Sequence, residues 1–476
     1  MIRFILAALL ATTGVPVAAQ TVAITGGMVA LGDGSEPIQN GTVVLRNGRV
    51  VAAGSSFGVR VPAGAQIVDA RGKWVTPGLV AGFSRLGLAE LDLSAHAEEG
   101  GGGATDTAGS ADDSTSNGPF NAAIDVVPAV NPMDSAISVN RADGVTRAVV
   151  APVAGRSIFA GQGAIIDTGA DMEPITAARN FQFVELGQTG AEKAGGSRAS
   201  SFLMFRNALR EARELSRYAS PIRSSSGDDD DALSRPVVRN PNEAREYGPD
   251  ARRSDDVMLT RFDAAALVPV LNGRQRLLVH VERARDILNV LSLKRDYSAL
   301  KLVLVGATEA WLVADRIAAA RVPVIASALN DLPASFEELA ATQSNIGRLR
   351  QAGVNVAIGM IDDNDTRNLF NGRQYAGNLV ALANVPGATG VPWGEALAMI
   401  TSRPAQVVGM GGEIGSLAPG RRGDVVIWSG DPLQVTSAAE AVYIDGVAQP
   451  LDNRQTKLRD RYRDIDERVL PEAYRR

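Results

Sequence analysis

The side chains best suited to chemistry in this sequence are one histidine and a carboxylate two residues beyond it. The chain has 476 residues, two histidines and no cysteine, which excludes thiol nucleophiles and thiolate metal sites. His280 lies near the end of the apolar run Leu277–Val281, and Glu282 follows. Alternate residues of a strand face one side, so both side chains could bind one divalent metal. The alternative is that His280 is a hydrogen-bonded core residue.

Other motifs are weaker indications of a chemical function. Gly409–Gly415 is rich in glycine but neither follows a predicted strand nor opens a predicted helix, which argues against a phosphate-binding loop. Ser224–Asp231 ends in four aspartates and is expected to be a solvated loop, with a calcium-binding turn as the alternative. Paired carboxylates would suffice for glycoside chemistry, but no spacing singles out such a pair.

The elements that must position these residues alternate between strands and helices through the middle of the chain. The clearest strands are Leu300–Val305 and Val354–Ile358, and the clearest helices are Glu309–Arg321 and Phe336–Ala352. This alternation is typical of βα units on a parallel sheet. We therefore predict an α/β protein with a TIM-type (β/α)8 barrel over residues 78–408. Loop insertions are expected near residues 96–118, a range that begins at His96, and near residues 224–256.

Both ends of the chain contain short β segments. Asn47-Gly48, between two apolar runs, is the favoured pair for a type I′ hairpin turn. Val425–Trp428 is a further apolar strand near the other end. We predict that residues 20–77 and 409–450 together form a β-sandwich beside the barrel.

The first 19 residues have the pattern of a secretory signal peptide, with one positive charge, a short apolar run and small residues up to Ala19. An exported protein, periplasmic or secreted, is expected. No other stretch approaches the roughly 18 apolar residues of a membrane-spanning helix, so no membrane insertion is expected. Residues 451–476 are expected to form a charged helix that packs against the body through apolar residues at helical spacing. These residues are Leu458, Tyr462, Ile465 and Val469.

The formal net charge of the chain is −5, and removal of Arg3 with the signal peptide makes it −6. This mild acidity gives no electrostatic case for nucleic acid or an anionic membrane as a partner. A small-molecule ligand or substrate is the expected partner. The oligomeric state is not indicated by the sequence.

Four segments, in this order and spacing, are similar to the amidohydrolase superfamily. They are Gly72–Gly87, Gly144–Pro152, Thr401–Gly409 and Gly415–Trp428. The resemblance extends from about Val22 to about Pro450. It implies a metal-dependent hydrolase of non-peptide carbon–nitrogen bonds, imidazolonepropionase-like in type, with one or two divalent metals at the C-terminal mouth of the barrel.

The resemblance places a His-x-His metal motif on the first barrel strand, where this chain has Phe83 and Arg85. Phenylalanine has no lone pair to donate, and arginine stays protonated and would repel a divalent cation. We therefore expect these two ligand positions to be lost. Phe83 is expected to fill the barrel mouth, and Arg85 to pair with a carboxylate.

The other ligand positions are partly filled. The resemblance makes His280 the ligand of the fifth strand, with Glu282 beside it, and offers Glu185 on the fourth strand. The resemblance also predicts a histidine ligand on the sixth strand, where this chain offers no softer metal ligand than Thr308. The catalytic aspartate after the eighth strand would be Asp362 or Asp363, although these residues are displaced by one position or more and could instead cap a helix or loop.

Two functions follow from these observations. The first is an exported amidohydrolase with a reduced site, in which His280, Glu282 and Glu185 bind one metal beside Asp362 or Asp363. The second is a non-catalytic barrel that acts as a binding scaffold, a pseudoenzyme. The loss of the first-strand and sixth-strand ligands favours weak or no ordinary metal-dependent hydrolysis. The expected cofactor is accordingly one divalent metal or none.

Overall fold

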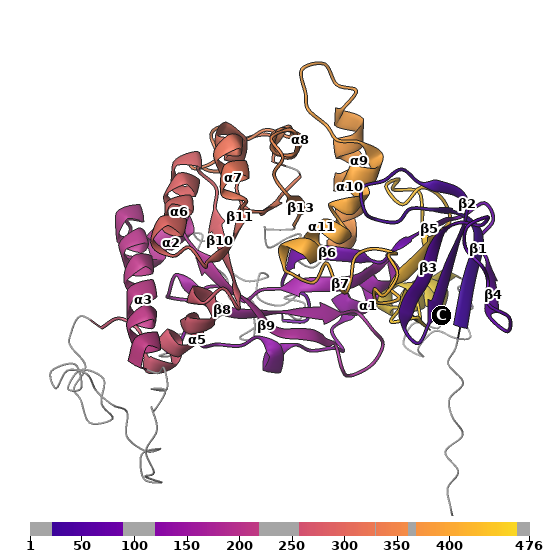
Figure 1. Ribbon diagram of the computed structural model, residues 1–476, viewed down its shortest axis with the longest axis horizontal. Coiled ribbons are helices and arrows are strands. Elements are labelled where there is room, and N and C mark those ends of the chain that lie inside the picture. The colour runs from indigo at the N-terminus through magenta and orange to yellow at the C-terminus, as the bar shows by residue number, and fades with distance from the viewer. Residues whose placement is uncertain (1–20, 89–119, 219–256, 329, 360–367, 464–476) are drawn as a thin grey trace, which may run out of the picture.

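The computed structural model describes residues 21–88, 120–218, 257–328, 330–359 and 368–463. In this part of the chain two eight-stranded sheets lie beside each other, and most helices cover the outer face of the second sheet (Figure 1). The predicted signal peptide lies outside the described residues. None of the described helices is long and apolar enough to cross a membrane.

The first sheet combines strands from both ends of the chain. Its strands are β1 (Thr21–Val29), β2 (Ile38–Arg46), β3 (Arg49–Ser55), β4 (Gln66–Asp69), β5 (Trp74–Pro77), β14 (Val425–Trp428), β15 (Ala439–Ile444) and β16 (Val447–Ala448). Strands β5 and β14 pair antiparallel, with Trp74 opposite Trp428. The predicted hairpin at Asn47-Gly48 is confirmed, because both residues have the positive φ that a type I′ turn requires, 52° and 74°.

The second sheet is a nearly closed barrel. Its strands are β6 (Leu79–Ser84), β7 (Val145–Val150), β8 (Phe159–Asp167), β9 (Ile175–Glu185), β10 (Arg276–Val281), β11 (Lys301–Gly306), β12 (Val324–Ala326) and β13 (Val356–Ile358). The last strand returns to the first, since β13 contacts β6. Gly82 permits this approach, because a Cβ there would lie 2.4 Å from the carbonyl oxygen of Ile358.

One strand departs from the predicted eightfold parallel arrangement. Strand β8 runs antiparallel to both of its neighbours, β7 and β9, whereas the other adjacent strands pair in parallel. The connections on either side of β8, residues 151–158 and 168–174, contain no helix. A parallel crossover needs a dozen or more residues, so these short connections force the chain to reverse direction.

The helices are α1 (Ser135–Ala142), α2 (Gly187–Lys193), α3 (Arg198–Tyr218), α5 (Arg261–Leu271), α6 (Ala284–Asp296), α7 (Ala314–Ala320), α8 (Asn345–Gln351), α9 (Gly372–Leu382), α10 (Trp393–Ala398), α11 (Ser402–Val407) and α12 (Arg454–Arg463). One apolar core fills the barrel interior and includes Phe83 and Leu278. A larger core lies between the barrel wall and the helices and includes Leu277 and Ile287. The alternation of Leu277 and Leu278 between two cores explains why this strand is apolar throughout.

Two predicted helices are shorter than expected. The helix expected over Glu309–Arg321 is divided into a 3-10 turn, Ala310–Val313, and α7. The helix expected over Phe336–Ala352 is limited to α8, so residues 336–344 form an irregular segment near the carboxyl ends of the barrel strands.

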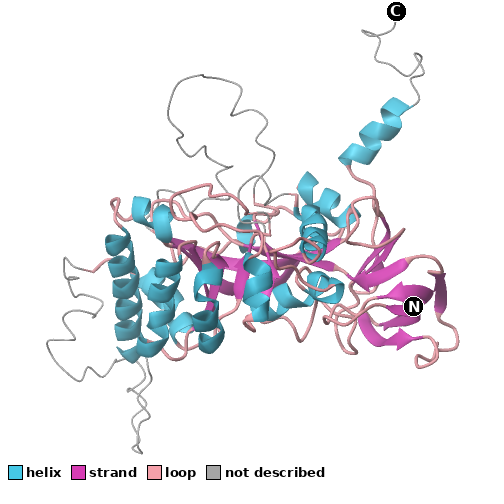
Figure 2. Ribbon diagram, turned by 90° about the horizontal axis from the view of Figure 1, so that it is seen from above, coloured by secondary structure: helices cyan, strands magenta, loops and turns pink. Residues whose placement is uncertain are grey.

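The C-terminal helix does not pack as predicted. Helix α12 has no buried side chain, and it projects from the body of the molecule (Figure 2). The side chains of Leu458 and Tyr462 are 41% and 57% exposed, while Ile465 and Val469 lie outside the described residues. The helix is polar on most of its surface, so two apolar side chains do not provide a continuous face for packing.

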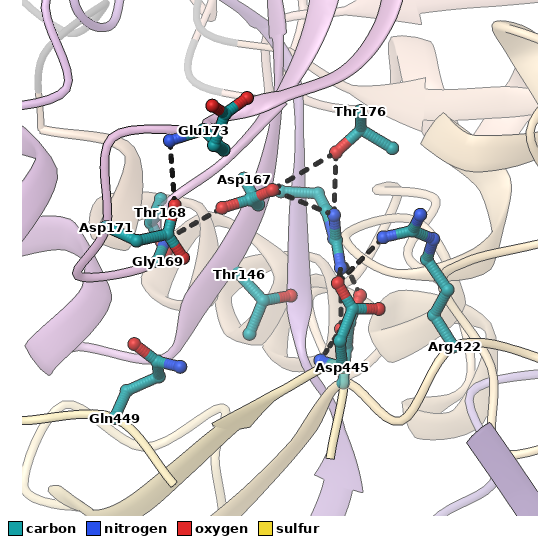
Figure 3. Close-up of polar contacts among 12 residues, drawn as sticks. Thr146, Asp167, Thr168, Gly169, Asp171, Glu173, Thr176, Arg422, Asp445 and Gln449 are labelled. Carbon is teal, nitrogen blue, oxygen red and sulfur yellow. Dashed lines mark hydrogen bonds and ion pairs between the residues drawn. The ribbon is translucent and has the colours of Figure 1, made fainter. Parts of the chain in front are cut away.

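A buried ion cluster joins the two sheets (Figure 3). Arg147 on β7 is fully buried, and its guanidinium contacts Asp424 at 2.8 Å, Asp445 at 2.9 Å and Asp167 at 3.2 Å. Arg422 reaches Asp445 as well, at 2.7 Å. Burial alone would lower the pKa of Arg147, but the three carboxylates raise it above its ordinary value. The cluster therefore connects a barrel strand to the strand ends of the first sheet.

Candidate functional site

The candidate site lies where strands β9 and β10 end. The two strands are parallel neighbours, and their register places His280 directly beside Glu185. The neighbouring residues Phe183 and Leu278 face the barrel interior, and the two-residue period of a strand directs Glu185 and His280 to the same side. The strands thus bring together two of the side chains that the sequence singled out.

His280 bridges two glutamates. Its Nδ1 lies 2.5 Å from Glu185 Oε2, and its Nε2 lies 2.8 Å from Glu282 Oε1. All three side chains are at most 18% exposed. Because each ring nitrogen faces a carboxylate oxygen, the geometry fits an imidazolium that donates two hydrogen bonds.

The electrostatics of this trio favour its charged state. Burial alone would lower the pKa of His280, but the charges and hydrogen bonds of Glu185 and Glu282 outweigh burial and raise the pKa well above 6.5. Burial would likewise raise the pKa of each glutamate, yet the imidazolium lowers both. The three groups therefore stabilise one another as an ionic triad.

Gly306 makes room for Glu282. This glycine ends strand β11 with φ of 82°, and a Cβ on it would lie 1.9 Å from Glu282 Oε1. The other carboxylate oxygen of Glu282 accepts a hydrogen bond of 2.8 Å from the backbone nitrogen of Thr308. Glu282 is thus held from two sides in a space that any larger residue at position 306 would fill.

Phe83 and Arg85, the residues at the positions where the resemblance predicts a His-x-His motif, form an aromatic and cationic cluster. Phe83 is buried in the barrel interior and its ring lies 5.1 Å from that of Phe183, edge to face. The guanidinium of Arg85 lies 5.0 Å from the ring of Phe83 and 5.5 Å from that of Phe183, within cation–π range.

Two cations hold the segment between β7 and β8. Arg85 Nη1 donates to the carbonyl oxygens of Ala151 and Pro152 at 2.5 and 2.7 Å. Lys193 Nζ donates to the carbonyl oxygens of Ala154 and Gly155 at 2.7 and 2.8 Å. Both positive charges also lower the pKa of Glu185, so they act on the triad while they order its surroundings.

Further carboxylates come from the irregular segment after β12, which the sequence pattern did not single out. Glu337 accepts hydrogen bonds from the backbone nitrogen of Gln188 at 2.8 Å and from Arg198 Nη2 at 3.1 Å. Burial raises the pKa of Glu338, and the charges of Glu282 and Glu337 add to this rise. These acids were missed because residues 336–344 resemble a helix in sequence.

Among the described residues, no three His, Asp or Glu side chains are arranged to hold a metal ion. Both nitrogens of His280 face carboxylates, and Phe83 cannot donate an electron pair. Asp362, Asp363 and His96 lie outside the described residues. The proposed ligand role of His280, Glu282 and Glu185 thus stays a prediction.

The arrangement limits the chemistry of the triad. A protonated imidazole cannot take up a further proton, so His280 cannot serve as a general base in this state. The single positive charge of this imidazolium also offsets one of the two negative charges of Glu185 and Glu282, to which it is hydrogen-bonded. What remains is a polar, hydrogen-bonded surface at the barrel mouth with carboxylates as its acceptors.

Comparisons with known proteins agree with one another. The model of the "Amidohydrolase family" matches residues 262–448. The chain is 26% identical over 411 residues to the amidohydrolase tasK of Hapsidospora irregularis, a match that covers 82% of this chain but only 38% of that protein. The structure is similar to that of an amidohydrolase from Thermotoga maritima MSB8, with a TM-score of 0.70, 22% identity, and coverage of 91% of this chain and 100% of the other. This structural likeness concerns the fold.

Proposed function

This chain belongs to the amidohydrolase superfamily, and we propose that it is an exported member whose barrel binds a small molecule without ordinary metal-dependent hydrolysis. In this proposal the second sheet is a (β/α)8-type barrel with one reversed strand, and the first sheet is the family's β-sandwich. The observation that supports the proposal best is the bridge of His280 between Glu185 and Glu282. An imidazole with both nitrogens engaged as donors has no lone pair for a metal ion.

The neighbouring charges support the same proposal. The positive charges of Arg85 and His280 both act on Glu185 and lower its pKa. A divalent cation that approached Glu185 would have to displace the imidazolium and tolerate the guanidinium. The carboxylate charge that a metal would need is therefore already balanced by this chain's own cations.

The competing function is hydrolysis of a non-peptide carbon–nitrogen bond with one metal. It is favoured by the convergence of Glu185, Glu282 and Glu338 near His280, because carboxylate oxygens suit magnesium, calcium or manganese. In that case His280 would lose its protons to become a ligand, and Asp362 or Asp363 would supply the general base.

Metal content separates the two functions. We expect purified protein, dialysed in turn against zinc, manganese, magnesium and calcium, to retain far less than one metal ion per chain by elemental analysis. About one tightly held ion per chain would contradict the proposal.

The His280→Ala variant provides the matched control. Under our proposal its metal content equals that of the wild type. A bound metal that disappears in this variant, together with any turnover, would assign the site to hydrolysis instead.

A further inference from the structure

A cavity of about 390 Å³ lies outside the barrel wall, between helices α3 and α6. It begins directly behind the triad, because Leu186 follows Glu185 and Val281 lies between His280 and Glu282. Small-molecule sites in proteins have volumes of about 300–1,000 Å³. The cavity is therefore large enough for a compact organic ligand.

We propose that this cavity binds a small organic carboxylate with an apolar body. One part of the cavity wall is apolar and is formed by Leu186, Phe202 and Val290. The other part is polar and includes two arginines. This division, an apolar surface with a few converging polar groups, is typical of small-molecule sites.

The charges of the polar wall favour an anion. Arg283 contacts Asp286 through two nitrogens, each at 3.1 Å. Arg198 also approaches Asp286, with Nε at 3.3 Å from Oδ2. Two guanidiniums thus share one carboxylate within the lining, and the second carboxylate that Arg198 contacts, Glu337, lies outside the lining. A ligand carboxylate could bind both guanidiniums at this wall, a contact to which arginine is well suited.

Arg198 and Arg283 remain accessible for such a contact. Their side chains are 34% and 39% exposed. The Nε of Arg198 is buried, and among the described residues it has no acceptor with hydrogen-bond geometry. Asn289, also in the lining, makes no side-chain hydrogen bond to any described residue. Its amide could donate to a second carboxylate oxygen.

A chain of hydrogen bonds also joins the wall of the cavity to the barrel mouth. Arg198 uses Nη2 to contact Glu337 at 3.1 Å, and Glu337 in turn accepts from the backbone nitrogen of Gln188. A ligand that attracts Arg198 would weaken its contact with Glu337. The proposal does not rest on the function assigned to the triad, because none of the three triad residues lines the cavity.

Isothermal titration with phenylacetate and phenylacetamide tests the proposal, because the two probes have the same size and differ in charge. We expect saturable binding of phenylacetate, at least about tenfold tighter than binding of the amide. No saturable binding of phenylacetate up to about 10 mM, or equal affinities for both probes, would overturn the proposal.

Substitutions in and near the lining locate the binding site of phenylacetate. Arg283→Met should weaken phenylacetate binding about tenfold or more. Arg285→Met, at an exposed arginine in the first turn of α6 and outside the lining, should leave it unchanged. Ala199→Phe should fill the cavity from its exposed rim and abolish binding. Binding that survives both Arg283→Met and Ala199→Phe would overturn the proposal.

Discussion

The junction of the two sheets and the barrel mouth each contain a buried cation among carboxylates, but only one of these cations can change its charge. Arg147 at the junction contacts three aspartates, and arginine remains protonated at every pH a protein experiences. His280 at the mouth contacts two glutamates, and histidine titrates near neutrality unless its partners prevent it. A buried cation among carboxylates is thus a permanent link at Arg147, which stays charged. It is a conditional link at His280, which acts only while the ring is protonated.

The largest effect is expected from breaking the permanent link. Arg147→Met removes the cation but leaves Asp424 buried, at 3% exposed, without its counterion. We expect a loss of about 3–5 kcal/mol in the free energy of unfolding, measured by urea denaturation. The control is Arg71→Met at the exposed pair with Asp69, which should cause no measurable change. Equal stability of the Arg147→Met variant and the wild type would show that the cluster is not a structural link.

The conditional link should give a smaller, pH-dependent effect. We expect His280→Gln to lose about 2–3 kcal/mol, because the glutamine keeps polar contacts but not the charge. The folded pKa of His280 is raised above 6.5, so its contribution is complete below pH 6.5 and disappears as the pH rises through the folded value. The glutamates have pKa values lowered from 4.5, so their contribution is present above pH 4.5 and is lost as the pH falls through the lowered values.

Urea denaturation of both proteins over a range of pH checks this expectation. The stability difference should be greatest between about pH 4.5 and 6.5 and should decrease on either side. Imidazole NMR should show a protonated His280 well above pH 6.5, and the second histidine signal is identified by its loss in His96→Gln. A stability difference that is constant with pH would contradict the ionic triad.

The smallest effect is expected from disturbing the triad indirectly. Gly306→Ala would displace the carboxylate of Glu282 from His280 and Thr308, whereas Gly353→Ala has the same positive φ, 85° against 82°, and meets no atom within 4 Å. Both variants bear the left-handed strain of about 1–2 kcal/mol. We expect Gly306→Ala to lose about 1–2 kcal/mol more and to lower the pKa of His280. Equal losses in both variants would mean that Glu282 is not held in place.

Local patterns in the sequence predicted much of the fold. The hairpin at Asn47-Gly48 follows from the two residues themselves, since few others adopt the required backbone. Strands β11 and β13 follow from short apolar runs. The reversal of β8 could not be predicted in this way, because all nine of its residues are buried and show no alternation that would reveal its surroundings.

The candidate site was predictable only in part. The proximity of Glu185 and His280 follows from their positions at the ends of neighbouring strands, which the sequence suggested. The bridge itself depends on strand register and on the space at Gly306, which no local pattern reveals. The contact of Arg198 with Glu337 joins a helix to an irregular segment 139 residues away, and this depends on tertiary packing.

The space at Gly306 also limits how the chain could change over generations. A histidine introduced there would collide with Glu282 and adopt an unfavourable backbone conformation. Glu282 would have to be replaced by a smaller residue first, which by itself removes one partner of His280. Mutational order therefore matters, and the shortest route toward an imidazole-rich site passes through an intermediate in which His280 lacks its contact with Glu282.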